Sequence, residues 1–487
     1  MTPRGAATLM VAVRPLVVLK YLGQLVLVFA GLVAVPLAAS LATGGGAADL
    51  RLGIIVVVML GVSIPLSRLP APARVQWNEA LTVTALAFVM APLVMISPLT
   101  AYGIPAVDAW FEAVSGVTTT GLSTLGSVAG RPPLMLFSRA WMQWYGGLGI
   151  AVLSVALVMR HHASSKRLLE SSGGDAIAAT ASTHARRMFL VYLVLTGVGI
   201  LLLWATLGDL FVALIHTLAA VSTGGFSGFD DSLAGMPVAS RAVVIVLCVL
   251  GAIALPLYYD LREKGPRVLL ADAEFRALIV AIALAAMVLS LLLHHNAGLP
   301  WDQAIGQGLL MGASAQTTSG FSGLNVASLD PASKLTLIAS MLTGGCSGST
   351  AGGIKLVRLL ILLRLIQLAL RSSAASERSV MHLRVGGTRL EHDVIVNALL
   401  LLGLWALVVF LSWFPFLLYG YDPLNALFEV VSATGTVGLS SGVSRPALEP
   451  ALKLLLTLDM LFGRVEIIAL LVVLYPGTWL GRRRATQ

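Results

Sequence analysis

Long apolar runs, separated by short polar or charged stretches, recur along almost the whole chain. Several exceed the roughly 20 residues that a helix needs to cross a bilayer. Where such runs end at Pro, Gly or charged residues, the pattern predicts ten membrane-crossing helices. The predicted crossings are residues 15–43, 52–67, 76–97, 135–159, 188–207, 240–259, 277–294, 332–370, 391–418 and 451–474.

Composition places the chain among membrane proteins. Hydrophobic residues make up 57% of its 487 residues, charged residues only 11%, and the mean hydropathy is +0.90. The first apolar run follows Arg4 and Arg14 and loosely resembles a signal peptide, but it is longer than a signal core and a second run follows at once. We therefore interpret it as a retained helix. Cys248 and Cys346 fit neither a disulfide framework nor a CxxC metal site.

Positive charge alternates between the segments that join the crossings. Lys and Arg number 23 in 1–14 and every second connecting segment after it, and 3 in the intervening segments. Translocation resists positive charge near helix ends, so the rich side is predicted to be cytoplasmic, with both termini on it. The net charge of +9 is thus a topology signal and not a nucleic-acid footprint.

The segments on the charge-poor side are too apolar to be plain loops. Four of them, 98–134, 208–239, 295–331 and 419–450, each contain a short helix-length run and then a small-residue turn built around a glycine. These four turns are called the glycine turns below. A small residue, Ser115, Ala219, Ser314 or Ser432, precedes each signature glycine by six positions. The signature glycines are spaced by 104, 95 and 118 residues. The turns read Thr119-Thr120-Gly121-Leu122-Ser123, Thr223-Gly224-Gly225-Phe226-Ser227, Thr318-Ser319-Gly320-Phe321-Ser322 and Thr436-Val437-Gly438-Leu439-Ser440.

This self-similarity predicts four equivalent units, each a crossing, a short pore helix, a glycine turn and a second crossing. All four share one orientation, so they can close around an axis normal to the membrane, unlike the inverted repeats of many transporters. The predicted fold is an all-α polytopic membrane protein with four parallel repeats around a central pore and two extra N-terminal helices. The predicted boundaries are 1–70 for the two-helix extension, 71–165, 184–262, 272–371 and 388–475 for the repeats, and 476–487 for a cytoplasmic tail.

The residue types of the glycine turns suit a cation. Glycine permits conformations that turn backbone carbonyls toward an axis and lets four chains approach closely. Rings of carbonyls can replace part of a cation's hydration shell, and the C-terminus of each pore helix adds partial negative charge. Four acidic residues lie near the pore-helix starts, where acidic N-caps are expected. They are Asp108, Asp209, Asp302 and Asp422.

Several further motifs together resemble the TrkH/TrkG/KtrB/HKT superfamily of K+ transporters, over residues 76–474. They are the stretches Phe111-Glu112-Ala113-Val114-Ser115-Gly116, Gln143-Trp144-Tyr145-Gly146-Gly147-Leu148-Gly149-Ile150, the glycine-rich run from Gly344 to Lys355, and Gly463-Arg464-Val465-Glu466. The two extra N-terminal crossings are similar to the TrkH branch, whereas the fourth turn reads more like KtrB.

The resemblance implies that K+ binds backbone carbonyls around the signature glycines. Glycine at all four signature positions resembles the K+-preferring members. Fewer carbonyl rings than in tetrameric K+ channels predict a less strict discrimination against Na+. The implied K+ site comprises Thr119, Thr120, Gly121, Thr223, Gly224, Gly225, Thr318, Ser319, Gly320, Thr436, Val437 and Gly438.

The predicted crossing 332–370 is nearly twice the needed length, and its glycine-rich middle cannot continue as a stable helix. Broken backbone in a membrane must face protein or a watery cavity. A gating loop under the turns, as the resemblance implies, and a rigid packing kink are both open readings. The gate residues would be Gly344, Gly345, Gly348, Gly352, Gly353, Lys355 and Arg464.

Arg464 lies in the middle of the last crossing, where an unpaired charge is costly and suggests function. The resemblance implies that it faces the ion path near the loop as an electrostatic barrier. The alternative is a structural ion pair with Glu466, Glu112 or Glu429.

Enzymatic chemistry is not predicted. The run from Gly348 to Lys355 lacks the Gly-Lys-Ser/Thr ending of a phosphate-binding loop, and Gly345-Cys346-Ser347-Gly348 fails the GxSxG pattern because Ser349 follows. The predicted function is K+ uptake through a channel-like pore, with no cofactor on this chain. The alternative is a K+ symporter coupled to Na+ or H+.

The resemblance also implies location and partners. We expect a multi-pass protein of the bacterial inner membrane, pairing of two copies, and a cytoplasmic ring of TrkA/KtrA-like nucleotide-binding subunits. The basic segments 160–187 and 355–390 are candidate docking surfaces, although attraction to anionic lipid explains their charge equally well.

Overall fold

The computed structural model describes residues 12–70, 75–166, 174–373, 384–386, 388–465 and 467–480. The predicted tail from residue 481 onward and Glu466 lie outside them. The chain divides into two compact units, Met1–Ile104 with Val465–Gln487, and Pro105–Arg464. The predicted repeat boundaries rest on internal sequence similarity and not on compactness, and they stay a prediction.

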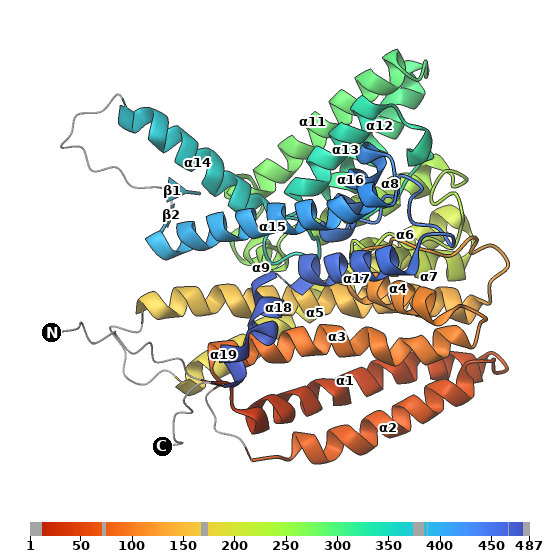
Figure 1. Cartoon of the computed structure of the whole chain (residues 1–487). Coiled ribbons are helices and arrows are strands. Elements are labelled where there is room, and N and C mark those ends of the chain that lie inside the picture. The colour runs from red at the N-terminus through yellow and green to blue at the C-terminus, as the bar shows by residue number, and fades with distance from the viewer. Residues whose placement is uncertain are drawn as a thin grey trace. The chain divides into compact units, whose positions relative to one another are not determined.

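The first unit is a small helical bundle. It contains α1 (Pro15–Ala42), α2 (Asp49–Ser67), α3 (Trp77–Thr100), α18 (Ile467–Leu474) and α19 (Pro476–Trp479). In Figure 1, α1, α2 and α3 run side by side at the red end of the chain. Arg14, just before α1, forms an ion pair with the buried Glu79 of α3 at 2.7 Å. This pair fixes the start of α1 against α3.

The second unit holds the four pore helices and most of the remaining crossings (Figure 1). The pore helices are α4 (Ala106–Val117), α7 (Leu210–Val221), α12 (Trp301–Gln316) and α16 (Pro423–Thr434). The other helices are α5 (Pro133–Lys166), α6 (Gly174–Leu207), α8 (Val238–Ala252), α9 (Leu255–Lys264), α10 (Arg267–Ala271), α11 (Ala273–His295), α13 (Pro331–Thr343), α14 (Leu356–Ser373), α15 (His392–Leu418) and α17 (Pro450–Val465). The 3-10 helix Val326–Ser328 and two short antiparallel strands, β1 (Arg384–Val385) and β2 (Thr388–Arg389), complete it.

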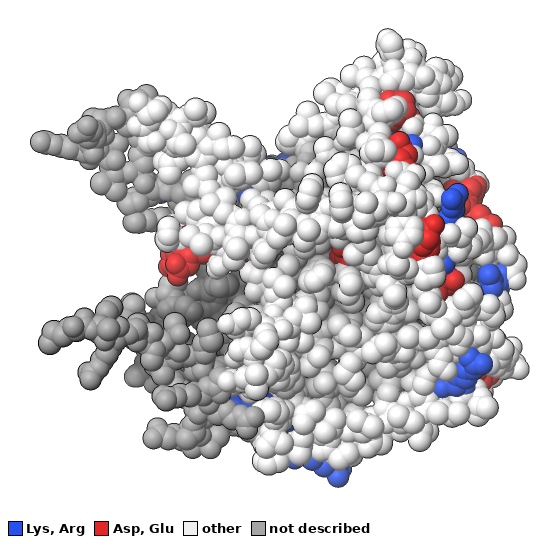
Figure 2. Space-filling view, in the orientation of Figure 1, with Lys and Arg blue, Asp and Glu red and all other residues white. Residues whose placement is uncertain are grey.

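The predicted helical membrane fold is confirmed. Within the described residues, six helices are long and apolar enough to cross a membrane, and a seventh if α8 and α9 form one bent crossing. Large apolar side chains such as Leu201, Phe410 and Leu411 are exposed on these helices. Figure 2 shows long stretches of surface with no charged side chain, as lipid-facing helices require.

Pore helices pack against crossings of two repeats. Each contacts its own repeat, as α6 contacts α7 and α11 contacts α12. Each also contacts the second crossing of the repeat before it: α5 contacts α7, α8 contacts α12, and α13 contacts α16. Between α17 and α4 the contact is a hydrogen bond from Trp110 to Thr457, 3.2 Å long. The repeats therefore follow one another around a closed ring.

The crossing predicted as one helix over 240–259 is broken. Its two halves, α8 and α9, meet at an angle of 88°. Pro256 has no N–H for the carbonyl of Ala252, so the helix cannot continue through it. That carbonyl instead accepts the N–H of Cys346 at 3.1 Å, and the N–H of Leu255 donates to the carbonyl of Gly348 at 3.0 Å. The break is thus satisfied by the glycine-rich loop, residues 344–355, which separates α13 from α14 as predicted.

The prediction of acidic N-caps is confirmed for two of the four pore helices. Asp209 and Asp422 cap α7 and α16 through the N–H groups of Val212 and Asn425. Prolines occupy the N-cap positions of α4 and α12, so Asp108 and Asp302 lie in the first turn and do not cap. Proline has no side-chain acceptor, so neither helix has a side-chain cap at its start.

Candidate functional site: a ring of four glycine turns

The four glycine turns share one unusual backbone. In each, the signature glycine and the threonine two positions before it both have positive φ. A positive φ is costly for threonine, which is β-branched, so its recurrence in all four turns marks an enforced geometry. The φ angles are 53° and 89° at Thr119 and Gly121, 52° and 79° at Thr223 and Gly225, 54° and 73° at Thr318 and Gly320, and 49° and 95° at Thr436 and Gly438.

The signature glycines close a ring. A Cβ on Gly121 would collide with the carbonyl oxygen of Gly224 in the next turn, and the same holds around the ring. In every case the oxygen belongs to the residue just before the next signature glycine. The remaining pairs are Gly225 with the carbonyl of Ser319, Gly320 with that of Val437, and Gly438 with that of Thr120. The sequence alone predicted the glycines, and the structure brings all four together.

The small pore-helix residues six positions before the signature glycines support the turns in different ways. The hydroxyls of Ser115 and Ser432 accept the N–H groups of Gly121 and Gly438, each at 3.0 Å. Ala219 has no hydroxyl, and its backbone carbonyl accepts the N–H of Gly224 at 2.7 Å. In repeat 3 the hydroxyl of Ser314 accepts that of Ser319 at 3.3 Å. The small residue is therefore buried in all four repeats, and its hydroxyl binds the signature glycine in two of them.

A second support, not predicted, comes from the pore-helix residue nine positions before each signature glycine. Glu112, His216 and Glu429 occupy this position in repeats 1, 2 and 4, and each bonds to the serine two positions after the glycine. The distances are 2.5 Å to Ser123, 3.0 Å to Ser227 and 2.8 Å to Ser440. Met311 holds the position in repeat 3, where the N–H of Ser322 instead donates to the hydroxyl of Ser232 at 3.1 Å.

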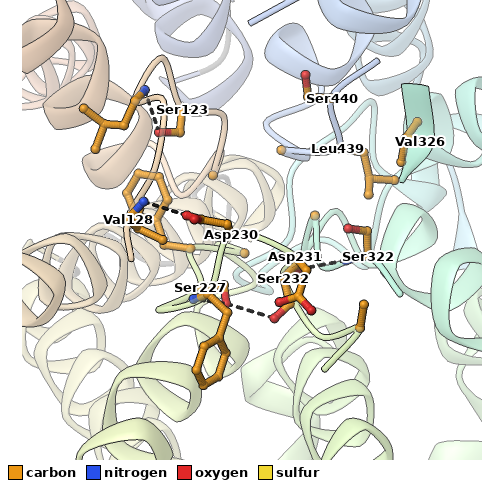
Figure 3. Close-up of a pocket in the computed structure, with 18 of the residues that line it drawn as sticks. Ser123, Val128, Ser227, Asp230, Asp231, Ser232, Ser322, Val326, Leu439 and Ser440 are labelled. Atoms are coloured by element: carbon orange, nitrogen blue, oxygen red, sulfur yellow. Dashed lines mark hydrogen bonds between the residues drawn. The ribbon is translucent and has the colours of Figure 1, made fainter. Parts of the chain in front are cut away.

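A cavity of about 580 Å³ lies on the glycine side of the ring. It is lined by the four signature glycines and by the serines that follow them, together with Asp230 and Asp231. Figure 3 shows Asp230 bonded to the N–H of Val128, at 2.6 Å, so that the loops after turns 1 and 2 are joined. The Ser127 hydroxyl and this N–H stabilise the Asp230 carboxylate and hold its pKa below the usual value.

The glycine-rich loop contacts the threonine side of the ring. The N–H of Gly352 donates to the Thr318 hydroxyl at 2.7 Å, and the hydroxyls of Thr223 and Thr350 lie 3.4 Å apart. A Cβ on Gly352 would collide with the Thr436 hydroxyl. The loop thus touches three of the four left-handed threonines, on the side of the ring opposite the cavity.

The predicted gate residues belong to this loop and its neighbourhood. Gly344, Gly348 and Gly353 have φ of 67°, 75° and 73°, and Lys355 has φ of 75° with its ammonium bonded to the carbonyl of Ala351. The N–H of Gly353 donates to the carbonyl of Gly435 at 2.9 Å. Because Gly345 has no side chain, the Ala351 side chain packs against it. The backbone carbonyl of Gly345 accepts the N–H of Leu356 at 3.1 Å.

Arg464 reaches the loop from α17 and is only 3% exposed. Its Nη1 donates to the carbonyl of Thr350 at 2.8 Å, and its Nη2 to that of Gly146 at 3.4 Å. Glu112 is paired with Arg139 at 2.9 Å and Glu429 with serines, so neither is its partner. The ion-pair alternative with those two residues is therefore wrong, and Glu466 lies outside the described residues.

Two further residues contact the candidate site and were not predicted from the sequence. Gln143 of α5 contacts the second turn, and Thr350 joins the loop to α7 and α8 through the carbonyls of Val221 and Gly251 at 3.1 and 2.9 Å. Gln143 begins the motif Gln143–Ile150, and a polar amide inside an apolar crossing is a sequence signal for such a contact.

Three comparisons relate the chain to known proteins. A family model described as TrkH, cation transport protein, matches residues 78–476. The Trk system potassium uptake protein TrkH of Escherichia coli (strain K12) is 30% identical over 76% of this chain and 79% of that protein. Its counterpart in Vibrio parahaemolyticus is 31% identical over 77% and 80%. The crystal structure of the potassium transporter TrkH from Vibrio parahaemolyticus superimposes with a TM-score of 0.85 at 27% identity, covering 96% of this chain and 100% of that one.

Proposed function

Because this chain belongs to the TrkH family of cation transport proteins, we propose that it takes up K+ across a membrane through the ring of glycine turns. The relatives named as potassium uptake proteins support the choice of ion.

The observation that carries the proposal is the closed ring of four glycine–carbonyl contacts. Left-handed residues at alternate positions let successive carbonyls face one side of the backbone, so four turns can offer rings of oxygens in place of water. A side chain at any signature glycine would displace the carbonyl of the next turn. Glycine at all four positions is what such a filter requires.

In this proposal the glycine-rich loop and Arg464 form the gate. The loop lies against the threonines at the inner end of the ring, and Arg464 binds it through the carbonyl of Thr350. Opening needs the loop to leave these contacts. A cation would meet the guanidinium charge on the way, which is costly in a low-dielectric passage.

The proposal includes orientation. The cavity beside Asp230 and Asp231 faces outward, and both termini lie in the cytoplasm of a bacterial cell, as the Lys and Arg distribution favours. Pairing of two copies and binding of a nucleotide-binding cytoplasmic ring stay predictions, carried by the family resemblance.

Growth of a bacterium without its own K+ uptake proteins, but with their cytoplasmic subunits, tests the proposal. Wild type should restore growth at low K+, whereas Gly121→Ser should lose K+ preference over Na+, because the new Cβ meets the carbonyl of Gly224. Uptake that collapses when the Na+ or H+ gradient is removed would favour a coupled symporter instead. An inserted wild type that does not restore growth contradicts the proposal.

A further inference from the structure

The second glycine turn lacks a side chain that the others have. Immediately before the signature glycine stand Thr120, Ser319 and Val437 in turns 1, 3 and 4, but Gly224 in turn 2. In two of these turns the side chain bonds within its own repeat. The Thr120 hydroxyl lies 2.7 Å from that of Thr118, and Ser319 accepts from Thr317 at 3.2 Å. Neither Val437 in turn 4 nor Gly224 in turn 2 carries a hydroxyl for such a bond, and Gly224 alone has no side chain at all.

Gln143 takes that place from the neighbouring repeat. It lies on α5, is fully buried, and spans the turn with both ends of its amide. Its Nε2 donates to the carbonyl of Gly224 at 2.5 Å, and its Oε1 accepts the N–H of Phe226 at 3.1 Å. A carbonyl can only accept and an N–H can only donate, so these partners fix which way the amide points.

Gly224 and Gln143 are sterically complementary. A Cβ on Gly224 would lie 2.6 Å from Oε1 and 2.8 Å from Nε2 of Gln143, closer than non-bonded atoms allow. Because Gly224 has no side chain, the Gln143 amide has room beside turn 2. The amide in turn gives turn 2 a side-chain hydrogen bond that Gly224 itself cannot make.

The carbonyl of Gly224 is one of the four that close the ring. Within the described part of the chain, it is the one ring carbonyl that accepts a hydrogen bond from a side chain. The bond occupies one lone pair and leaves less negative charge for an ion. It also anchors the carbonyl to a helix of another repeat.

We propose that Gln143 is a positioning residue for ion selectivity, holding the Gly224 carbonyl of turn 2 at the distance and strength that favour K+ over Na+. The inference rests on the proposed function, since it needs the ring to be the ion filter. Selectivity in such a ring depends on the spacing and field strength of its carbonyls. Loss of the two hydrogen bonds between Gln143 and turn 2 should therefore change K+/Na+ selectivity more than it changes K+ flux.

Three variants test this in purified full-length protein reconstituted into lipid vesicles, with K+ and Na+ flux measured separately. Gln143→Leu removes both hydrogen bonds of the Gln143 amide and keeps a side chain of similar volume. Gly224→Ser places a side chain where the Gln143 amide lies. The double variant Gln143→Ala with Gly224→Ser recreates the arrangement of turn 3, with Ser222 standing where Thr317 stands. Gln24→Leu, at an exposed position of α1, is the matched control.

The K+/Na+ flux ratio should fall roughly fivefold in Gln143→Leu, because one of the two lost bonds is the one to the ring carbonyl of Gly224. The ratio of Gly224→Ser should fall at least as far. The double variant should recover most of the wild-type ratio, and the ratio of Gln24→Leu should equal that of wild type. Recovery by the double variant is the result that mere destabilisation cannot produce.

A folded Gln143→Leu protein with the wild-type ratio overturns the inference while leaving the proposed function intact. If Gln143→Leu does not fold, the double variant decides: recovered selectivity supports the inference, and a folded double variant as unselective as Gly224→Ser overturns it. A wild type that does not prefer K+ overturns both the inference and the proposed function.

Discussion

At the scale of single residues, the charge of Arg464 is met by backbone carbonyls and not by a carboxylate of the described chain. A buried guanidinium without an anion is expensive, and Nε has no hydrogen-bond partner within that part of the chain. Buried charges inside membrane proteins cost free energy and commonly mark residues that act in transport. Here one end of the side chain holds the glycine-rich loop at Thr350, which links an unfavourable charge to the proposed gate.

Arg464→Ala should increase K+ flux. The substitution removes a positive charge from the proposed ion path and a charged hydrogen bond to the loop. Such a bond is worth about 1.5 kcal/mol or more, so flux should rise on the order of tenfold. Flux into vesicles at equal protein content measures it, with Arg464→Lys as the control that keeps the charge. Unchanged flux in a normally folded Ala variant would contradict the gate assignment.

At the scale of elements, the pore helices share a geometry but not a chemistry. The position nine residues before the signature glycine carries Glu, His, Met and Glu in the four repeats. Glu429 is the most engaged of them. Its carboxylate accepts the N–H groups of Ser441 and Ser444, each at 3.0 Å, besides the hydroxyl of Ser440. This carboxylate ties the chain after turn 4 back to α16.

Glu429→Leu should lower the free energy of unfolding by about 3 kcal/mol, because it leaves the N–H groups of the buried Ser441 and the half-buried Ser444 without an acceptor. Met311→Leu, the same position in repeat 3, is the matched control and should cost less than about 1.5 kcal/mol. Denaturant unfolding in detergent compares them. Equal losses in the two variants would show that the position matters for packing alone.

At the scale of the whole molecule, two equivalent contacts join successive repeats in the unit Pro105–Arg464. Lys334 of α13 donates to the Asn425 side chain of the next pore helix at 2.9 Å, and Lys453 of α17 donates to Asp108 at 2.6 Å. Asp108 and Asn425 stand at the same position, 13 residues before their signature glycines. The ion pair therefore lies where the last repeat meets the first and closes the ring.

Lys453→Met should destabilise the protein by about 3 kcal/mol, since it leaves the buried Asp108 carboxylate without its cation. Lys334→Met faces a neutral amide and should cost about 1 kcal/mol. Adding Asp108→Asn to Lys453→Met should restore part of the loss. Unfolding in detergent measures all three, and a double variant no more stable than Lys453→Met would contradict the ion-pair account.

Much of this organisation could be predicted from the sequence. Apolar runs, the Lys and Arg bias and the spacing of the four glycine turns depend on local composition and on repetition, which can be read along the chain. The interruption at residues 344–355 was predicted for the same reason, because glycine disfavours helix wherever it occurs. These features need no knowledge of what packs against them.

Only the tertiary structure decided how the turns are held. The break between α8 and α9 is completed by backbone groups of the glycine-rich loop, about a hundred residues away. Gln143 clamps a turn of another repeat, and Arg464 and Lys453 find partners more than 100 residues away in sequence. Each of these contacts joins segments whose proximity depends on the closed ring. The sequence by itself determined the repeating elements, and the fold determined which residues meet, because satisfying buried polar groups is a property of neighbours in space.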